Sequence, residues 1–321
     1  MIYSAVLSKR EVLGLTSEAP KQAWLAIKGD PHVPGSRFGP SSLKVFTPRL
    51  AVSTWAGRRF LGRRVPVVNL VNHTPTPIER GWSVRVTQVR DFRGRALTYD
   101  SHNGTDFAVP PGTRVVASAP GRVVAMRNEF NRGGLKVYVD HGGGLLSSYH
   151  HLARSLVDLG QDVSRGEVIA LSGYSGLDAL ASFPWVAPHV HYNVMLGGTL
   201  IDPFARSGEV SLWRTGNEPR PSSGEITEAT EATAFDGPRV EALLVTLKDD
   251  GRRAALDRIR DPALRGWALA IEAATYPTRF PREGAGAQLF AAAPQRRELL
   301  DLPFEGADFD GIAFADDEGL R

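Results

Sequence analysis

The sequence predicts a mainly β protein with a small helical region at its C-terminal end. Two observations support this fold class. From about Arg80 to Ala205, short apolar runs alternate with glycine-bearing turns and almost no helical periodicity is present, as in sandwiches and barrels. Near the C-terminus, two segments instead carry apolar residues at helical spacing, with a proline close to each start. A length of 321 residues suggests two or three domains, and a 42% hydrophobic content is enough for a substantial core.

Residues 1–80 are expected to form an irregular extension with short strands that lies on the main domain. Three apolar pieces, at residues 23–27, 43–46 and 65–70, alternate with Pro- and Gly-rich turns. The valines between Ser83 and Phe92 favour a further strand.

A main domain is expected over residues 81–213. Its strand candidates are rich in β-branched residues and separated by turn residues, and one helical turn is predicted near Ala153–Leu159; the clearest runs start at Thr113, Gly121, Leu135 and Glu167.

Residues 214–237 have the composition of a linker, and residues 238–321 are predicted to be an acidic helical region. The expected helices cover 238–248 and 262–275. Nothing in this region carries recognisable chemistry, so packing or partner binding is its expected role.

The charge distribution favours an anionic partner for the main body. Residues 1–214 hold 25 Lys and Arg against 15 Asp and Glu, whereas residues 215–321 hold 13 against 20. A cell-wall polymer, a membrane surface or nucleic acid would fit a basic body. Aromatic residues are not interleaved with the basic runs, so we expect no nucleic-acid partner. No apolar run is long enough to cross a bilayer.

Two histidines near residue 190 are expected to share one face of a strand. Side chains in a strand alternate between faces, so His189, His191 and Asn193 would lie on one side, and Val190 and Tyr192 on the other. The first face offers nitrogen ligands and the second an apolar surface for a core. The chain has no cysteine, so any metal must use His, Asp or Glu.

A second candidate for ligands is the segment from His102 to Asp106. Its Asn-Gly pair favours a tight turn, which could bring the imidazole and the carboxylate to one ion. Together with a histidine of the later strand, they would give three N/O ligands, the set of a catalytic zinc site with one position open for water. Six of the eight histidines lie between His102 and His191, a concentration that scattered structural histidines would not show.

Over residues 101–204 the chain resembles the lysostaphin-type zinc metallopeptidases, which are peptidoglycan endopeptidases with a duplicated hybrid motif fold. Five elements of the family pattern occur in order: His-x-x-x-Asp at 102–106, Asp-His-Gly at 140–142, Tyr-x-His-Leu at 149–152, the Val/Gly hairpin pattern at 157–169, and His-x-His at 189–191.

The resemblance implies a role for each matching residue. His102, Asp106 and His191 would be the zinc ligands, with His151 and His189 as catalytic residues beside the metal. A zinc-bound water becomes acidic enough to attack a carbonyl, and a neutral imidazole can take its proton or hold the developing oxyanion. His150 is expected to face away from the site, and His141 to be structural.

The chain departs from the family pattern at two places. Asn193 stands where the family usually has Glu, which removes a carboxylate from the face of the histidines. The segment 177–187 is bulky and apolar where the family is Gly- and Thr-rich. Phe183 and Trp185 are therefore expected to line or narrow the substrate groove.

The motifs and the departures from them are compatible with three functions. The leading one is a zinc-dependent endopeptidase acting on peptidoglycan cross-links. The alternative is a catalytically silent relative that binds and regulates another cell-wall hydrolase, although such relatives typically lose ligands that this chain keeps. A biotinyl-type carrier is set aside, because Lys136 lacks the flanking pattern. A wall hydrolase would act in the cell envelope or outside the cell, whereas the absence of a visible signal peptide favours the cytoplasm. The bond cleaved and the oligomeric state stay open.

Overall fold

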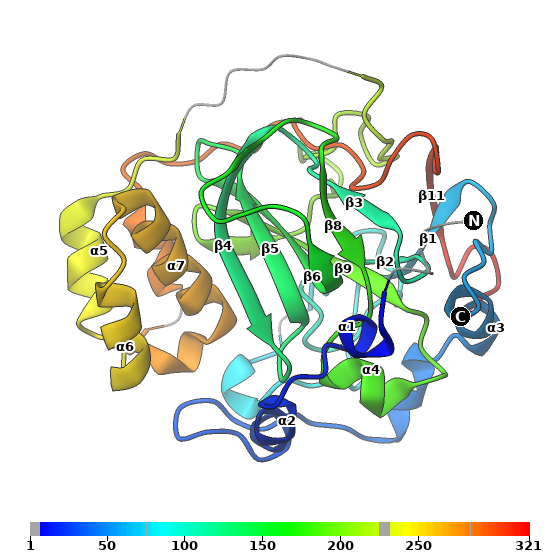
Figure 1. Cartoon of the computed structure of the whole chain (residues 1–321), viewed down its shortest axis with the longest axis horizontal. Coiled ribbons are helices and arrows are strands. Elements are labelled where there is room, and N and C mark those ends of the chain that lie inside the picture. Colours follow the sequence, from blue (N-terminus) through cyan, green and yellow to red (C-terminus); the bar gives the residue numbers. More distant parts are fainter. Residues whose placement is uncertain (1–6, 75, 225–231, 283) are drawn as a thin grey trace.

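The computed structural model describes residues 7–74, 76–224, 232–282 and 284–321. Its strands form an 11-stranded sheet with the path β11-β1-β2-β9-β6-β5-β4-β7, while β10 pairs with β9 and β8 joins β3 to β6. Helices α5, α6 and α7 lie together beside β4 (Figure 1). The strands are β1 (Arg64–Asn69), β2 (Thr105–Ala108), β3 (Arg114–Val116), β4 (Gly121–Glu129), β5 (Gly134–Asp140), β6 (Leu145–Ser155), β7 (Asp162–Val163), β8 (Val168–Ser172), β9 (His189–Leu196), β10 (Thr199–Ile201) and β11 (Gly311–Phe314).

The helices are short except for one. They are α1 (Lys9–Leu13), α2 (Ala19–Lys28), α3 (Pro48–Trp55), α4 (Leu177–Ser182), α5 (Gly237–Leu244), α6 (Asp250–Asp257) and α7 (Pro262–Thr275), with 3-10 turns at Pro40–Val45, Ile78–Arg80, Pro277–Arg279 and Ala285–Leu289. No described helix combines the length and the apolar character that a bilayer crossing needs.

The mainly β character of residues 105–201 is confirmed. The strand candidates after Thr113, Gly121, Leu135 and Glu167 correspond to β3, β4, β5 and β8. Alternation along β9 follows the expected pattern, since Val190, Tyr192 and Val194 are fully buried in the main core. The predicted helical turn at Ala153–Leu159 is wrong, because β6 continues to Ser155 and bonds to β8.

The N-terminal extension is more helical than expected. Residues 23–27 lie within α2, which has Pro20 in its first turn and Gly29 at its C-terminal cap. Residues 43–46 fall largely in a 3-10 turn, and only the piece at 65–70 is a strand. Helix-forming Ala, Lys and Gln outweighed the short apolar run in α2.

The strand predicted at Ser83–Phe92 is also wrong. The Asp100 carboxylate accepts hydrogen bonds from the Ser83 hydroxyl and from the backbone N–H and hydroxyl of Thr87. These bonds to a side chain take the place of the backbone hydrogen bonds that a neighbouring strand would otherwise provide.

The C-terminal helices α5 and α7 are confirmed, and α6 was not predicted. Their apolar faces pack on Tyr138, Leu146 and Met195 of the sheet, so the helices cover one face of β4, β5, β6 and β9. Beyond Thr275 the chain returns to the sheet: β11 pairs in parallel with β1, and Leu300 and Phe304 are buried in the main core. The domain boundaries drawn from the sequence stay predictions, and residues 225–231 of the predicted linker lie outside the described residues.

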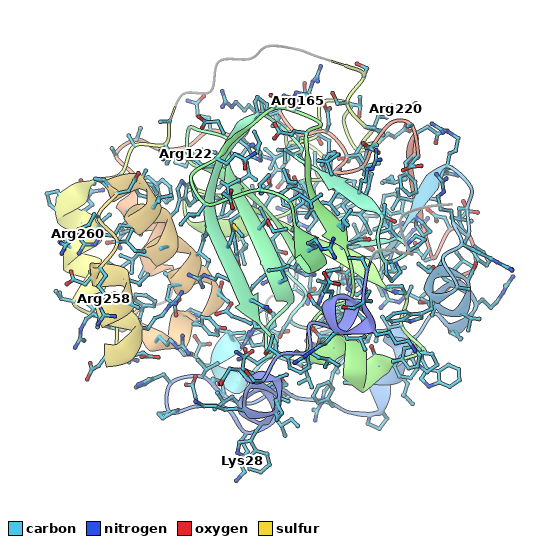
Figure 2. All side chains as sticks on the ribbon, viewed as in Figure 1. Lys28, Arg122, Arg165, Arg220, Arg258 and Arg260 are labelled. Atoms are coloured by element: carbon cyan, nitrogen blue, oxygen red, sulfur yellow. The ribbon has the colours of Figure 1, made fainter. Side chains whose placement is uncertain are left out.

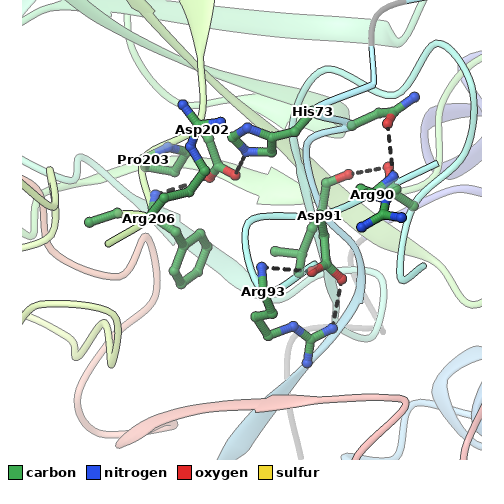
Figure 3. Close-up of polar contacts among 12 residues, drawn as sticks. His73, Arg90, Asp91, Arg93, Asp202, Pro203 and Arg206 are labelled. Carbon is green, nitrogen blue, oxygen red and sulfur yellow. Dashed lines mark hydrogen bonds and ion pairs between the residues drawn. The ribbon is translucent and has the colours of Figure 1, made fainter. Parts of the chain in front are cut away.

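The loop between β1 and β2 carries His102 and is fixed by polar contacts. His73 Nε2 lies 2.7 Å from Asp202 Oδ2, and Asp91 accepts from the backbone and the guanidinium of Arg93 (Figure 3). Arg93 in turn pairs with Asp316 near the C-terminus. Because both ends of the loop are tied to other elements, it presents His102 at the start of β2 with little freedom.

Candidate metal centre

Three side chains from neighbouring backbone segments converge where β2 pairs with β9. Asp106 pairs directly with His191 in the strand register, and His102 lies at the end of the loop before β2. His102 Nε2 is 3.0 Å from Asp106 Oδ2, His191 Nδ1 is 2.7 Å from Asp106 Oδ1, and the two nitrogens are 3.2 Å apart. The predicted set His102, Asp106 and His191 is therefore brought together.

The donor atoms are oriented by hydrogen bonds behind them. His102 Nδ1 donates to the Leu70 carbonyl at 2.7 Å, which leaves Nε2 as its lone-pair donor toward the cluster. Asn69, which the sequence did not single out, donates to Asp106 Oδ2 at 2.7 Å. Burial would raise the pKa of Asp106, but attraction to the neighbouring imidazoles of His102 and His189 holds it well below its usual value.

The cluster fits a tetrahedral divalent metal such as zinc. Ligands about 2.0–2.2 Å from a tetrahedral ion lie roughly 3.3–3.6 Å from one another. The measured contacts of 2.7–3.2 Å are shorter than this range, because the side chains hydrogen-bond directly to one another. One ligand atom from each residue lies within 4.8 Å of the other two, so small side-chain shifts would admit the ion. Two imidazole nitrogens and one carboxylate oxygen suit zinc, and three protein ligands leave one position for water or substrate.

His151 and His189 stand beside this cluster with their rings in contact. Their centroids are 4.9 Å apart, and both side chains are buried. The Nδ1 of His151 lies 2.8 Å from the Ser175 carbonyl, and that of His189 lies 2.8 Å from the Ala187 carbonyl. Each Nδ1 must donate to its carbonyl, so each Nε2 is left as an acceptor. Burial lowers the pKa of His151 well below its usual value, and repulsion from His189 and His191 adds to this effect. The neutral ring is therefore favoured.

The prediction that His150 faces away is wrong. Its ring lies 5.1 Å from that of His191 and lines the same cavity as His151. The reason is backbone conformation: His151 has φ 57°, the single positive φ of a non-glycine residue within the described ranges. This left-handed residue interrupts the alternation of β6, so consecutive side chains both reach the site.

His141 lies in the core, in agreement with the structural role predicted for it. Its Nδ1 is 2.9 Å from the Pro120 carbonyl, and its Nε2 is 2.7 Å from the Ser147 hydroxyl. Burial lowers its pKa to about 4.

This His141 environment predicts acid sensitivity. The unfolded state takes up a proton near pH 6.5 and the folded state near pH 4, so stability is intact above pH 6.5 and falls as pH drops toward 4. Between pH 7 and pH 5 this residue should cost about 2 kcal/mol of unfolding free energy. Urea unfolding of the metal-stripped wild type and of His141→Gln tests this, and equal losses in both proteins would refute it.

Asn193 lies on the face of the histidines, as predicted. Its side chain is 7% exposed and lines the cavity, and its Nδ2 is 3.4 Å from Asn103 Oδ1. Gly104 packs directly against it: a Cβ there would lie 2.1 Å from Asn193 Oδ1 and 2.7 Å from His191 Nε2. The glycine of the Asn-Gly pair thus leaves room for the His191 ring.

Replacing Gly104 with alanine should push His191 out of line. We expect metal affinity to fall about 10- to 100-fold, the range seen when residues supporting a metal ligand are changed. Competition with a chromogenic chelator measures the affinity. Gly237→Ala is the matched control, because a Cβ at Gly237 meets nothing within 4 Å; equal affinities in the two variants would contradict the expectation.

Phe183 and Trp185 do not line this cavity, and their predicted place along the substrate groove stays a prediction. Phe183 packs edge-on against Trp55 with centroids 5.1 Å apart, and both Phe183 and Trp185 are about half exposed. The cavity wall in this segment is made by Leu177, Asp178 and Ala181 of α4.

Comparison with known proteins identifies the region that holds the cluster. Residues 100–203 match the model of peptidase family M23, which confirms the resemblance inferred from the five motifs. The peptidoglycan DD-endopeptidase ShyA of Vibrio cholerae is 43% identical over 97 residues, 30% of this chain and 21% of ShyA. The DD-carboxypeptidase/endopeptidase Mpg of Neisseria meningitidis is 32% identical over 152 residues, 47% of this chain and 30% of Mpg.

A solved structure of a zinc-containing peptidase from Vibrio cholerae is 30% identical and covers 44% of this chain and 40% of that one. The TM-score between the two chains is 0.29. The chain spans between a fifth and a third of the length of the curated relatives named above.

Proposed function

We propose, because residues 100–203 match peptidase family M23, that this chain is a zinc-dependent endopeptidase that hydrolyses peptide bonds of peptidoglycan cross-links. The observation that carries the proposal is the convergence of His102 Nε2, the Asp106 carboxylate and His191 Nδ1, with the rings of His151 and His189 beside them.

A bound zinc would supply an acidified water and would polarise the scissile carbonyl. His102, Asp106 and His191 would hold it. The remaining work falls to the two flanking histidines, whose Nδ1 atoms are committed to backbone carbonyls. The Nε2 of a neutral ring can take a proton from the attacking water, and in its protonated form it can donate to the oxyanion or to the leaving amine.

The substrate class rests on the relatives. ShyA and Mpg are named for action on DD-peptide bonds, and ShyA for action on peptidoglycan. The basic main body of this chain is compatible with an anionic polymer. Action on such a substrate would place the protein in the cell envelope or outside the cell.

Digestion of purified peptidoglycan tests the proposal. Protein loaded with zinc should cleave the cross-links and release soluble fragments with fewer cross-links, a chelator should stop the release, and added zinc should restore it. Metal analysis should find about one zinc per chain. Digestion that ignores the chelator would overturn the metal-dependent mechanism. Binding to the wall without digestion would instead favour the silent regulatory relative.

A further inference from the structure

The cavity beside the metal cluster is lined in part by residues outside the M23 match. It measures about 130 Å³, room for roughly four water molecules. Its floor includes His191 and Asn193, while Phe38 and Trp82 from the N-terminal part and Ile271 from α7 add walls. Any substrate group entering it meets side chains from outside residues 100–203 as well as from within them.

Two cationic residues line this cavity, and they differ in how they are neutralised. Lys136 is buried and paired with Glu129, and its ammonium also donates to the Arg132 carbonyl at 2.8 Å. Arg132 makes no ion pair with any described residue, and this includes Asp178, the carboxylate that lines the same cavity. Its positive charge is attracted by Glu129 and Asp178, but no described carboxylate lies within ion-pair distance of the guanidinium.

Two buried donors on this wall also have no acceptor. They are Arg132 Nη1 and Trp82 Nε1, both without a hydrogen-bond partner in the structure. The two groups are neighbours, since the guanidinium lies 4.2 Å from the Trp82 ring centroid and 5.2 Å from that of Tyr276. Buried donors are nearly always paired in proteins, and leaving them unpaired is costly. The aromatic rings also restrict the guanidinium to a narrow range of orientations.

We propose that Arg132 and Trp82 form a carboxylate-binding subsite next to the metal centre. Two adjacent N–H donors, one of them cationic, match the two oxygens of a carboxylate. The inference rests on the proposed function and sharpens its substrate class. The chain would prefer peptide bonds whose leaving residue carries a free carboxyl group beside the scissile nitrogen. A terminal residue and a cross-linking residue with a free carboxyl group both satisfy this condition.

A pair of peptides tests the subsite directly. One is an N-acetylated peptide ending in D-alanyl-D-alanine, and the other is the same peptide ending in a carboxamide. Wild-type protein should cleave the free acid with a kcat/KM about 10- to 100-fold higher, since a site built to bond a polar group rejects the analogue without it. In Arg132→Gln the preference should disappear, because the rate on the free acid falls by a much larger factor than the rate on the carboxamide.

Two further variants guard against a folding artefact. Trp82→Phe keeps the aromatic ring under the guanidinium but removes the N–H, so it should reduce the preference by a smaller factor of about 2 to 10. Arg258→Gln is the control for a lost arginine, because Arg258 is exposed on the helical side of the molecule (Figure 2). It should keep the full preference.

Binding of N-acetyl-D-alanine and of its carboxamide to zinc-loaded protein separates this inference from the proposed function. If Arg132→Gln binds the acid more weakly than wild type does, and the binding of the carboxamide changes much less, the subsite is supported even where neither peptide is cleaved. A lack of cleavage would then count against the enzyme proposal alone. Equal handling of acid and carboxamide by wild type, or an equal loss on both in Arg132→Gln, would overturn the subsite.

Discussion

Replacing His191 with alanine is expected to lower peptide-bond hydrolysis at least about 1,000-fold, because metal activation of the attacking water and of the carbonyl is worth several kcal/mol. His191 Nδ1 lies 2.7 Å from Asp106 and 3.2 Å from His102 Nε2. Removing the imidazole leaves two of the three donors, so bound zinc should be lost as well. Metal content and peptidoglycan digestion, measured on one preparation, check both effects.

The matched control for this variant is His32→Ala. His32 is only half-buried and lies outside the cluster, so its loss should leave metal content and rate close to wild type. Near-ultraviolet circular dichroism establishes that the His191→Ala variant stays folded. A folded variant that keeps its zinc, or one that digests wall at the wild-type rate, would show that His191 is not a ligand.

The metal cluster was predictable from the sequence because its parts are local. The spacing of His189 and His191 fixes which side chains share a face of β9. Asp106 follows His102 by four residues, although Gly104 lies in a bend and not in the tight turn that an Asn-Gly pair favours. The pairing of β2 with β9 places Asp106 opposite His191. No local pattern indicates this long-range contact, and only the family resemblance predicted that the two residues share one metal.

Other features depend on contacts that no local pattern contains. The helical state of residues 23–27 was missed because a five-residue apolar run fits either a strand or a helix. The pairing of β11 with β1 joins residues 64–67 to 311–314. Neither segment has a sequence feature that indicates which strand it pairs with. The subsite donors Trp82 and Arg132 come from separate loops and carry no motif, so only the folded chain brings them together.

The position of His150 departs from strand alternation because of one backbone angle. Strand alternation places adjacent side chains on opposite faces, yet φ 57° at His151 lets both reach the cavity. Histidine adopts this region more often than most residues do, but the sequence alone does not say where. His150 therefore joins His151 and His189 as a candidate base, and variants of His150 and His151 separate those two.

His151→Asn is expected to lower kcat about 100- to 10,000-fold, the usual contribution of a general base, while zinc stays bound. Asparagine suits the left-handed backbone at this position, and its amide can donate to the Ser175 carbonyl as the His151 Nδ1 does. What the variant lacks is the Nε2 acceptor. Single-turnover hydrolysis with measured zinc content isolates that loss from any loss of metal.

His150→Gln is the counterpart, and it should cost less than about tenfold. The Nε2 of His150 lies 2.9 Å from the Ser148 hydroxyl, so it is already engaged within its own strand, and a glutamine amide can keep that contact. A large loss in His150→Gln together with a small one in His151→Asn would assign the proton transfer to His150. Comparable losses in both would mean that the two rings act on the reaction together, because interdependent groups give strongly non-additive effects.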